Sequence, residues 1–403
     1  MPNNKKKKPG RERGKSWTLL VHGARPALEQ PAPVNPPISR ASTYLHRTVA
    51  DMRDTERRRA AGERVKAYGR RGTDTGFLLE DLLVELEGGH GARLTSCGLA
   101  ANTLVFQTYL RPGDRVLVGD SVYGPVRKFV TKYLPAFGIA YELVATNADE
   151  IAAKLTRETK LIYLECPGST LFELTDLPRV VSIARANGAL VAVDNTWGSA
   201  LLYNPIRLGA DISILSATKY LAGHSDVLLG AVVANEHAWP ALNEMAELVG
   251  ASCASEDAYL VLRGLRTLAV RLNEHARQAG ALIEWFRKQP FTAKVYYPAL
   301  ADHPDHAIWK RDFSGSCGLF SVEFTGVTPT QVEAFVDALE LFGIGSSWGG
   351  FESLARVEDV ASLRTVSSRP AGPLVRFHAG FEAVDDLIRD LESATRVLGE
   401  GAR

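Results

Sequence analysis

Short apolar segments alternate with amphipathic ones between residues 91 and 234, and this alternation limits the fold more than any other feature of the sequence. Segments such as Leu190-Val191-Ala192-Val193 are apolar at every position, which is typical of strands buried on both faces. The pattern predicts an α/β fold with a mostly parallel sheet covered by helices. Strands are expected at residues 92–95, 115–118, 140–144, 160–165, 189–193, 212–215 and 231–233, and helices at 77–86, 96–110, 124–133, 149–155 and 177–187.

The pattern changes after Glu256. Residues 256–288 predict a long helical region, and the remainder reads as α+β, with strands at 294–297, 318–324 and 374–378 and helices at 329–340 and 383–398. An apolar stripe in the helical region is core or an interface. We therefore expect three parts: an extended N-terminal arm and inter-subunit segment (1–72), a large domain (73–265) and a smaller α+β C-terminal domain (266–403).

Composition excludes several functional classes. A net charge of +1 provides no general attraction to nucleic acid or to an anionic membrane, and no apolar run is long enough to span a bilayer. Four widely spaced cysteines suit a reducing cytosol better than a disulfide or zinc framework. The basic residues 5–15 have no apolar stretch after them, so we expect a solvated tail, with a basic arm for an acidic partner as the alternative.

Lys219 lies in an unusual place for a charged side chain. It follows the apolar alternation of residues 211–215 and precedes a turn at Gly223. Burial there would favour loss of the ammonium charge, and a desolvated amine can condense with an aldehyde. The alternative is a strand-end lysine that keeps its charge in water. Residues elsewhere in the sequence that could bind an aldehyde cofactor would favour the first interpretation.

Polar residues follow several predicted strands, and ligands of parallel sheets bind beyond the carboxyl ends of strands. Asp194 ends its strand directly; it could cap the next turn or place a carboxylate against a cationic ring nitrogen. Tyr123 could be a core aromatic or could stack on a flat cofactor. The full set is Ser121, Tyr123, Glu165, Asp194, Asn195, Thr196 and residues 216–219.

Three further segments are candidates for anion binding. Residues 96–99 open a helix, so free N–H groups and the helix dipole would suit a phosphate, although a plain turn is the alternative. Tyr68 and Arg70 could deliver an aromatic ring and a guanidinium to an anionic ligand, or could belong to a solvated loop. Arg376 lies within an apolar strand and needs an anionic partner, from either the protein or a ligand.

Taken together, these features are the parts of a pyridoxal phosphate site. They supply an amine for the aldehyde, a carboxylate for the ring nitrogen, a helix start for the phosphate and an aromatic for the ring. Dinucleotide and Walker signatures are both missing from the sequence. The glycines of the loop at residues 346–350 would allow another backbone or a ligand to approach closely.

The chain resembles the Cys/Met-metabolism pyridoxal phosphate enzymes of fold type I from about residue 17 to residue 400. The resemblance implies their fold, with residues 73–265 as the pyridoxal phosphate-binding domain. The motifs that carry it are Tyr68-x-Arg70-Arg-Gly-Thr, Leu86-Glu-Gly-Gly, Ser96-Cys-Gly98, Asp120-Ser-Val-Tyr123, Glu165-Cys-Pro-Gly-Ser169, Asp194-Asn-Thr-Trp197, Ala217-Thr-Lys219-Tyr-Leu-Ala-Gly-His-Ser-Asp226, Arg263-Gly-Leu-Arg-Thr-Leu268, Ser347-Trp-Gly-Gly350 and Leu374-Val-Arg376-Phe-His378.

The same resemblance implies roles toward the cofactor. Lys219 would carry pyridoxal 5'-phosphate as an aldimine and then move protons. Asp194 would keep the ring nitrogen protonated, and Tyr123 would stack on the ring and assist proton transfer. The phosphate would be held by Gly98, Leu99, Ser216 and Thr218 of one subunit and by Tyr68 and Arg70 of its neighbour.

For the substrate, the resemblance implies an amino acid whose α-carboxylate is bound by Arg376, with Ser347, Trp348 and Tyr68 nearby. It also implies catalytic dimers within a homotetramer, and a cytoplasmic enzyme without a bound metal. The implied reaction is β-elimination from L-cystathionine, which yields homocysteine, pyruvate and ammonia for methionine biosynthesis.

Related enzymes that act at the γ-carbon, including γ-synthases, γ-lyases and methionine γ-lyases, remain alternatives. They typically have Glu-Ser-Leu-Gly-Gly where this chain has Ser346-Ser347-Trp348-Gly-Gly, and often Asn-Pro-Thr after the Tyr-x-Arg motif. A broader cysteine-S-conjugate β-lyase and a non-catalytic binding protein are further alternatives. Departures from close β-acting relatives at Ala67, Lys128 and Glu247 leave the preferred thioether open.

Overall fold

The computed structural model describes residues 12–25, 31–359, 362 and 364–399. Residues 5–11 of the predicted basic tail lie outside these residues, whereas its residues 12–15 belong to the first helix. The helices are α1 (Glu12–His22), α2 (Val49–Ala60), α3 (Asp74–Glu87), α4 (Gly98–Tyr109), α5 (Gly124–Lys132), α6 (Ala148–Lys154), α7 (Leu177–Ala186), α8 (Trp239–Val249), α9 (Ser255–Leu265), α10 (Leu268–Phe286), α11 (His306–Asp312), α12 (Pro329–Asp337), α14 (Val384–Ala394) and α15 (Arg396–Gly399), with 3-10 turns η1 (Gly69–Arg71) and η2 (Leu134–Phe137).

A seven-stranded sheet forms the centre of the larger part of the molecule. Its strands are β1 (Gly91–Thr95), β2 (Arg115–Gly119), β3 (Ala140–Val144), β4 (Thr159–Glu165), β5 (Leu190–Asp194), β6 (Ile212–Ser216) and β7 (Gly230–Ala234). Their spatial order is β1-β7-β6-β5-β4-β2-β3. Strand β7 runs antiparallel to both of its neighbours, whereas the β6-β5-β4-β2-β3 pairs are parallel. The predicted mostly parallel sheet is confirmed.

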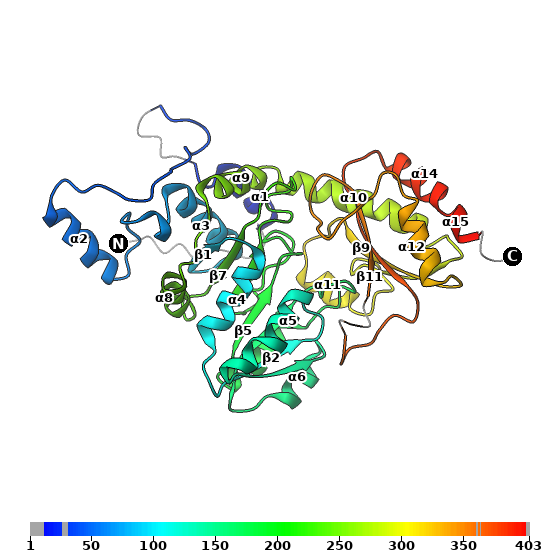
Figure 1. The fold of residues 1–403 in the computed structure, drawn as a ribbon, viewed down its shortest axis with the longest axis horizontal. Coiled ribbons are helices and arrows are strands. Elements are labelled where there is room, and N and C mark those ends of the chain that lie inside the picture. The colour runs from blue at the N-terminus through cyan, green and yellow to red at the C-terminus, as the bar shows by residue number, and fades with distance from the viewer. Residues whose placement is uncertain (1–11, 26–30, 360–361, 363, 400–403) are drawn as a thin grey trace.

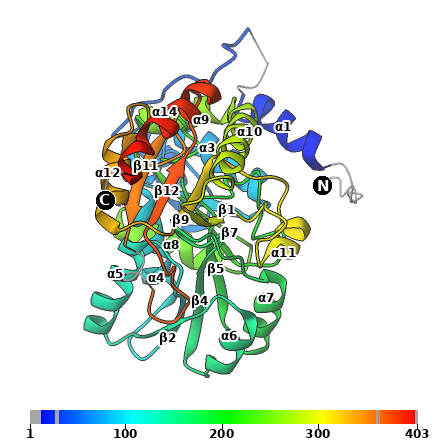
Figure 2. The same ribbon diagram turned by 90° about the vertical axis from the view of Figure 1, so that its right-hand side faces the viewer.

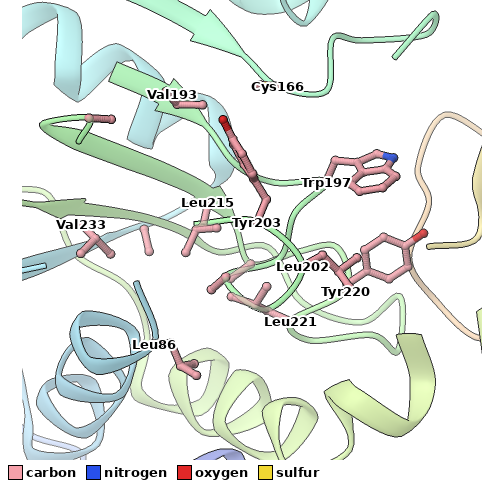
Figure 3. Close-up of a cluster of buried hydrophobic side chains, with 14 of the residues drawn as sticks. Leu86, Cys166, Val193, Trp197, Leu202, Tyr203, Leu215, Tyr220, Leu221 and Val233 are labelled. Carbon is pink, nitrogen blue, oxygen red and sulfur yellow. The ribbon is translucent and has the colours of Figure 1, made fainter. Parts of the chain in front are cut away.

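Alternate residues of these strands pack on opposite faces of the sheet, as the strand period requires. In β2, Leu117 packs in one buried cluster with α3, α7 and α9, while Val116 and Val118 pack in another with α4, α5 and α8. Figure 2 shows α6 and α7 on one side of β4 and β5, and α4 and α5 on the other. Figure 3 shows part of the first cluster, which includes Val193, Leu215 and Val233 of three adjacent strands and Leu86 of α3.

A second sheet of five strands forms the smaller part (Figure 1). Helices α10, α12 and α14 contribute to its separate buried cluster. Its strands are β8 (Thr292–Tyr296), β9 (Leu319–Phe324), β10 (Gly343–Ile344), β11 (Leu354–Glu358) and β12 (Leu374–His378), in the order β10-β11-β12-β9-β8. The two-sheet architecture agrees with the α/β-plus-α+β prediction, while the boundaries at residues 72 and 265 stay a prediction.

The predicted helical region at residues 256–288 consists of two helices, α9 and α10. The carbonyl oxygen of Gly264 accepts hydrogen bonds from the Thr267 backbone (3.1 Å) and from Nη2 of Arg271 (2.8 Å). The helix therefore breaks at Arg266 and Thr267. The Leu268 end of α10 then packs in the core of the large sheet, and the Phe286 end packs in that of the small sheet.

Candidate active site

Lys219 lies in the turn that follows β6, between the two sheets. Its Nζ donates a hydrogen bond to Oγ of Ser347 (2.8 Å) and lies 5.4 Å from the centre of the Trp348 ring. Burial, with a smaller contribution from Arg376, lowers the pKa of the Lys219 amine to about 8, against an opposing effect of Asp194. The lysine is therefore a desolvated amine that loses its charge at a lower pH than an ordinary lysine does.

Asp194 ends β5 and is buried. One carboxylate oxygen accepts hydrogen bonds from the backbone N–H (3.0 Å) and hydroxyl (2.6 Å) of Thr196. The other accepts a hydrogen bond from Nδ2 of Asn102 (3.2 Å). Burial raises the pKa of Asp194, while these hydrogen bonds and Lys219 favour the charged form. The result is a firmly oriented carboxylate close to the amine.

Glu165 is a second, half-buried carboxylate at the same sheet edge. It ends β4 directly opposite Asp194 in the register, and it accepts a hydrogen bond from the backbone N–H of Tyr123 (2.6 Å). Burial, reinforced by Asp194, raises its pKa well above the ordinary value. The predicted set of strand-end residues contained Glu165, but no role was assigned to it. Two adjacent parallel strands that both end in a carboxylate were the available signal.

The candidate phosphate site lies where α4 begins beside β6. Cys97 precedes α4 without a side-chain cap, so the first N–H groups of the helix lack that partner. A Cβ at Gly98 would come within 2.6 Å of Oγ of Ser216, so only glycine allows this approach. Leu99 packs partly buried on the adjacent core. The hydroxyl of Thr218 contacts the Leu229 backbone N–H at 3.0 Å.

The loop at residues 346–350 packs against the Lys219 turn. Gly349 has φ +89°, and a Cβ there would come within 2.8 Å of the Tyr220 backbone nitrogen. Its N–H donates to Nε2 of His378 (3.0 Å), whose Nδ1 bonds to the carbonyl oxygen of Glu352 (3.1 Å). Burial keeps the pKa of His378 well below its ordinary value, which agrees with an accepting Nε2. This positioning role of His378 was not predicted.

We expect Gly349→Ala to lower the free energy of unfolding by about 2–4 kcal/mol, because it adds left-handed strain and a backbone clash. Thermal unfolding measures the change. Gly280→Ala is the matched control, since Gly280 lies in α10 and a Cβ there would meet nothing within 4 Å. That substitution should raise stability by about 0.5–1 kcal/mol. Equal midpoints for the two variants would contradict the proposed packing of the loop.

Arg376 of β12 is buried among apolar residues and has protein partners. It pairs with Glu358 at 3.4 Å and contacts the carbonyl oxygen of Ser346 at 3.4 Å. Burial lowers its pKa, and Glu358 opposes that shift. Tyr123, which is 47% exposed, lies within the electrostatic reach of Arg376 and Glu165. The structure therefore brings residues 123, 194, 219, 347, 348 and 376 into one site.

A family model described as "Cys/Met metabolism PLP-dependent enzyme" matches residues 17–396, nearly the whole chain. The chain belongs to this family. A cystathionine beta-lyase of Bordetella avium is 44% identical over 383 residues, which cover 94% of this chain and 96% of the relative. The cystathionine beta-lyase MetC of Escherichia coli is 39% identical and covers 93% and 97%. The solved cystathionine gamma synthase of Xanthomonas oryzae has a TM-score of 0.87 and 33% identity, and covers 96% and 98%.

These comparisons confirm the fold of the pyridoxal phosphate-dependent trans-sulfuration enzymes, and the enzyme class with it. The residues fit the cofactor that the family requires. Lys219 offers an amine of lowered pKa, Asp194 a buried carboxylate, and Gly98 a cradle beside Ser216 that a side chain would fill. Within the described residues, no cluster of potential metal ligands occurs. No described helix is both long and apolar enough to cross a membrane.

Tyr68 and Arg70 are not part of this constellation within one subunit. Tyr68 precedes η1 and is 48% exposed, and the Arg70 guanidinium lies 5.9 Å from its ring centre. Arg70 also donates to the carbonyl oxygen of Glu247 in α8 (3.1 Å). Their predicted role in the site of a neighbouring subunit stays a prediction.

The lowered pKa of Lys219 makes cofactor uptake depend on pH. Since the uncharged amine is the nucleophile, its fraction rises from about one-tenth at pH 7 to about nine-tenths at pH 9. We expect the initial rate at which cofactor-free protein takes up pyridoxal phosphate to rise about tenfold over this range, with a midpoint near pH 8. The cofactor's absorption spectrum follows the reaction. A midpoint near pH 10 would contradict the desolvated state of the amine.

Proposed function

We propose that the protein is a carbon–sulfur β-lyase that converts L-cystathionine into homocysteine, pyruvate and ammonia, as a step of methionine biosynthesis. Pyridoxal 5'-phosphate would be attached covalently to Nζ of Lys219. The observation that carries the proposal is the desolvated amine beside the oriented Asp194 carboxylate. The similarity to two proteins named cystathionine beta-lyase supports the choice of reaction.

When bound, the cofactor supplies an electron sink for the pair released from the α-carbon. Lys219 takes the α-proton, for which an amine with a pKa near 8 is well matched to neutral pH. Asp194 keeps a positive charge on the ring nitrogen. Arg376 binds the α-carboxylate, and Ser347 and Trp348 orient the substrate beside Nζ. A double bond then forms between the α- and β-carbons as the β-carbon–sulfur bond breaks and the sulfur leaves as a thiolate. Hydrolysis of the resulting enamine by water gives pyruvate and ammonia.

The phosphate would be held at the start of α4 by the backbone of Gly98 and Leu99, with Ser216 and Thr218 beside it. The uncapped N–H groups and the helix dipole support this placement. Tyr123 would stack on the ring and assist proton transfer. The Glu165 carboxylate, which accepts a hydrogen bond from the Tyr123 N–H, would hold Tyr123 in place for this role.

The decisive experiment supplies L-cystathionine, L-cysteine and L-methionine to the holoenzyme and identifies the keto acid. Pyruvate together with homocysteine supports the proposal. The γ-acting alternative would give 2-oxobutyrate, and its support is the similarity to a cystathionine gamma synthase. Pyruvate from L-cysteine but little from cystathionine would indicate a broader β-lyase, and bound cofactor without any keto acid would indicate a non-catalytic protein.

We also propose a homotetramer built from two catalytic dimers, in which Tyr68 and Arg70 complete the neighbour's phosphate site, with Tyr68 also near its substrate. Exposed apolar side chains on the arm and α8, including Leu45, Val49 and Leu248, support contact with another subunit. The four unpaired cysteines support the cytoplasm as its location.

A subunit-mixing test checks the shared site. Tyr68→Phe and Lys219→Ala homomers should each be nearly inactive. Mixed dimers carry one site with both changes and one with neither, so equal mixing should restore about a quarter of wild-type activity. The control mixes Ser347→Ala protein with Lys219→Ala protein. Because Ser347 and Lys219 contact each other within one subunit, every site of this mixture carries one of the two changes, and mixing should restore no activity. If Tyr68 served its own subunit, no activity would return.

A further inference from the structure

Two arginines face each other at the edge of the candidate site. Arg356 of β11 lies directly opposite Arg376 of β12 in the antiparallel register, so both side chains project from the same face of the sheet. Like charges at directly opposite positions destabilise a sheet. This arrangement therefore calls for an anion that both guanidiniums can share.

The protein itself provides one carboxylate near both arginines, but this carboxylate lies closer to Arg376 than to Arg356. Glu358, two residues further along β11, lies 3.4 Å from Arg376 and 3.7 Å from Arg356. The second distance is too long for a hydrogen bond. Its Oε1, the atom in both ion pairs, is buried without a hydrogen-bond partner. The N–H donors of Arg356 thus remain unused by the carboxylate beside them.

The two arginines differ in depth. The Arg376 side chain is 10% exposed, whereas that of Arg356 is 44% exposed. Both act electrostatically on Tyr123, the residue proposed to stack on the cofactor ring, and the effect of Arg356 is the larger of the two. Arg356 is therefore the outer guanidinium of the pair and Arg376 the inner one, and both lie within electrostatic reach of Tyr123.

We propose that Arg356 binds a second carboxylate at the far end of the substrate side chain, and so selects β-thioether amino acids that end in a carboxylate. This inference rests on the proposed function for the position of the α-carboxylate at Arg376. A substrate anchored there extends its side chain outward toward the solvent-exposed guanidinium. L-Cystathionine, which has two carboxylates, belongs to this class.

The test compares S-(2-carboxyethyl)-L-cysteine with S-propyl-L-cysteine, which lacks the distal charge. We expect the holoenzyme to prefer the carboxylate substrate. Arg356→Gln should lower kcat/KM for that substrate about 10- to 100-fold, mainly by raising KM, because a charge-assisted pair is lost. The rate for the propyl substrate should change less than about threefold, and Arg356→Lys should restore part of the loss. Equal losses for both substrates would overturn the inference.

Equilibrium binding provides a test that does not need turnover. Calorimetry should show that glutarate binds the wild-type holoenzyme about tenfold or more tightly than butyrate, and that Arg356→Gln removes the difference. Glutarate binding that is unchanged in the variant would overturn the inference. Formation of 2-oxobutyrate from cystathionine, or of no keto acid, would instead count against the proposed function. Because Arg356→Gln relieves like-charge repulsion, its midpoint of thermal unfolding should not fall.

Discussion

Lys219→Ala is expected to lower the rate of pyruvate formation from L-cystathionine by a factor on the order of 10³ or more. The variant loses both the nucleophile for the cofactor and the base for the α-proton, and a positioned base alone contributes about 10²–10⁴-fold. Lys219→Arg should not rescue activity, because a guanidinium stays charged. Steady-state kinetics on cofactor-saturated protein measures the effect.

A second measurement separates loss of chemistry from loss of fold. After borohydride treatment, mass spectrometry should find the cofactor fixed to wild-type protein and to a Lys288→Ala control, but not to Lys219→Ala. Lys288 is a surface residue that pairs with Glu284, so its removal should leave both activity and attachment intact. Retention of more than about a tenth of the activity by Lys219→Ala would refute the assigned role.

Asp120→Ala is expected to lower the free energy of unfolding by about 3–5 kcal/mol. Asp120 follows β2 and is completely buried, and it pairs with Arg127 at 2.6 Å. It also accepts hydrogen bonds from the backbone N–H groups of Thr365, Val366 and Ser367 at 3.1, 2.9 and 2.7 Å. Alanine would leave a buried guanidinium and three donors without their acceptor, and this unpaired state is the main cost.

Chemical denaturation measures that change, and Asp149→Ala is the control. Asp149 also pairs with an arginine, Arg179, but at an exposed site, so its removal should leave the denaturation midpoint almost unchanged. Burial alone would raise the pKa of Asp120, yet the donors from Ser367 and Arg127 hold it below the ordinary value. The stabilisation should therefore be complete above about pH 4 and decline as the medium becomes more acidic. A difference between the variants that persists undiminished in strong acid would contradict this account.

The sequence predicted most of the strands, because apolar runs and their turns are local signals. It also placed Lys219, Asp194 and Tyr123 together, since strand ends of a parallel sheet meet at one edge. Local patterns could not supply the contacts that join distant segments. Asp120 binds residues 365–367 from about 245 positions away, and Arg356 meets Arg376 only through the register of two strands.

Three further features of the structure were not predicted from the sequence or could not be decided from it. Helix α8 was not predicted, although Pro240 at its start and Gly250 at its end are ordinary helix signals. The break before α10 depends on the Gly264 carbonyl being used by Arg271, which no periodicity encodes. The role of Tyr68 and Arg70 requires a second subunit, so neither the sequence pattern nor one folded chain can decide it.

Helix α10 belongs to two cores at once, because Leu268, Ala269 and Leu272 pack under the large sheet and Leu282, Ile283 and Phe286 under the small one. If either core unfolded, the apolar side chains at one end of α10 would become exposed to water while the other end stayed packed in the other core. The two parts of the molecule should therefore unfold together in one cooperative transition. The continuous helix is enough to couple their stabilities, without a flexible hinge inside it.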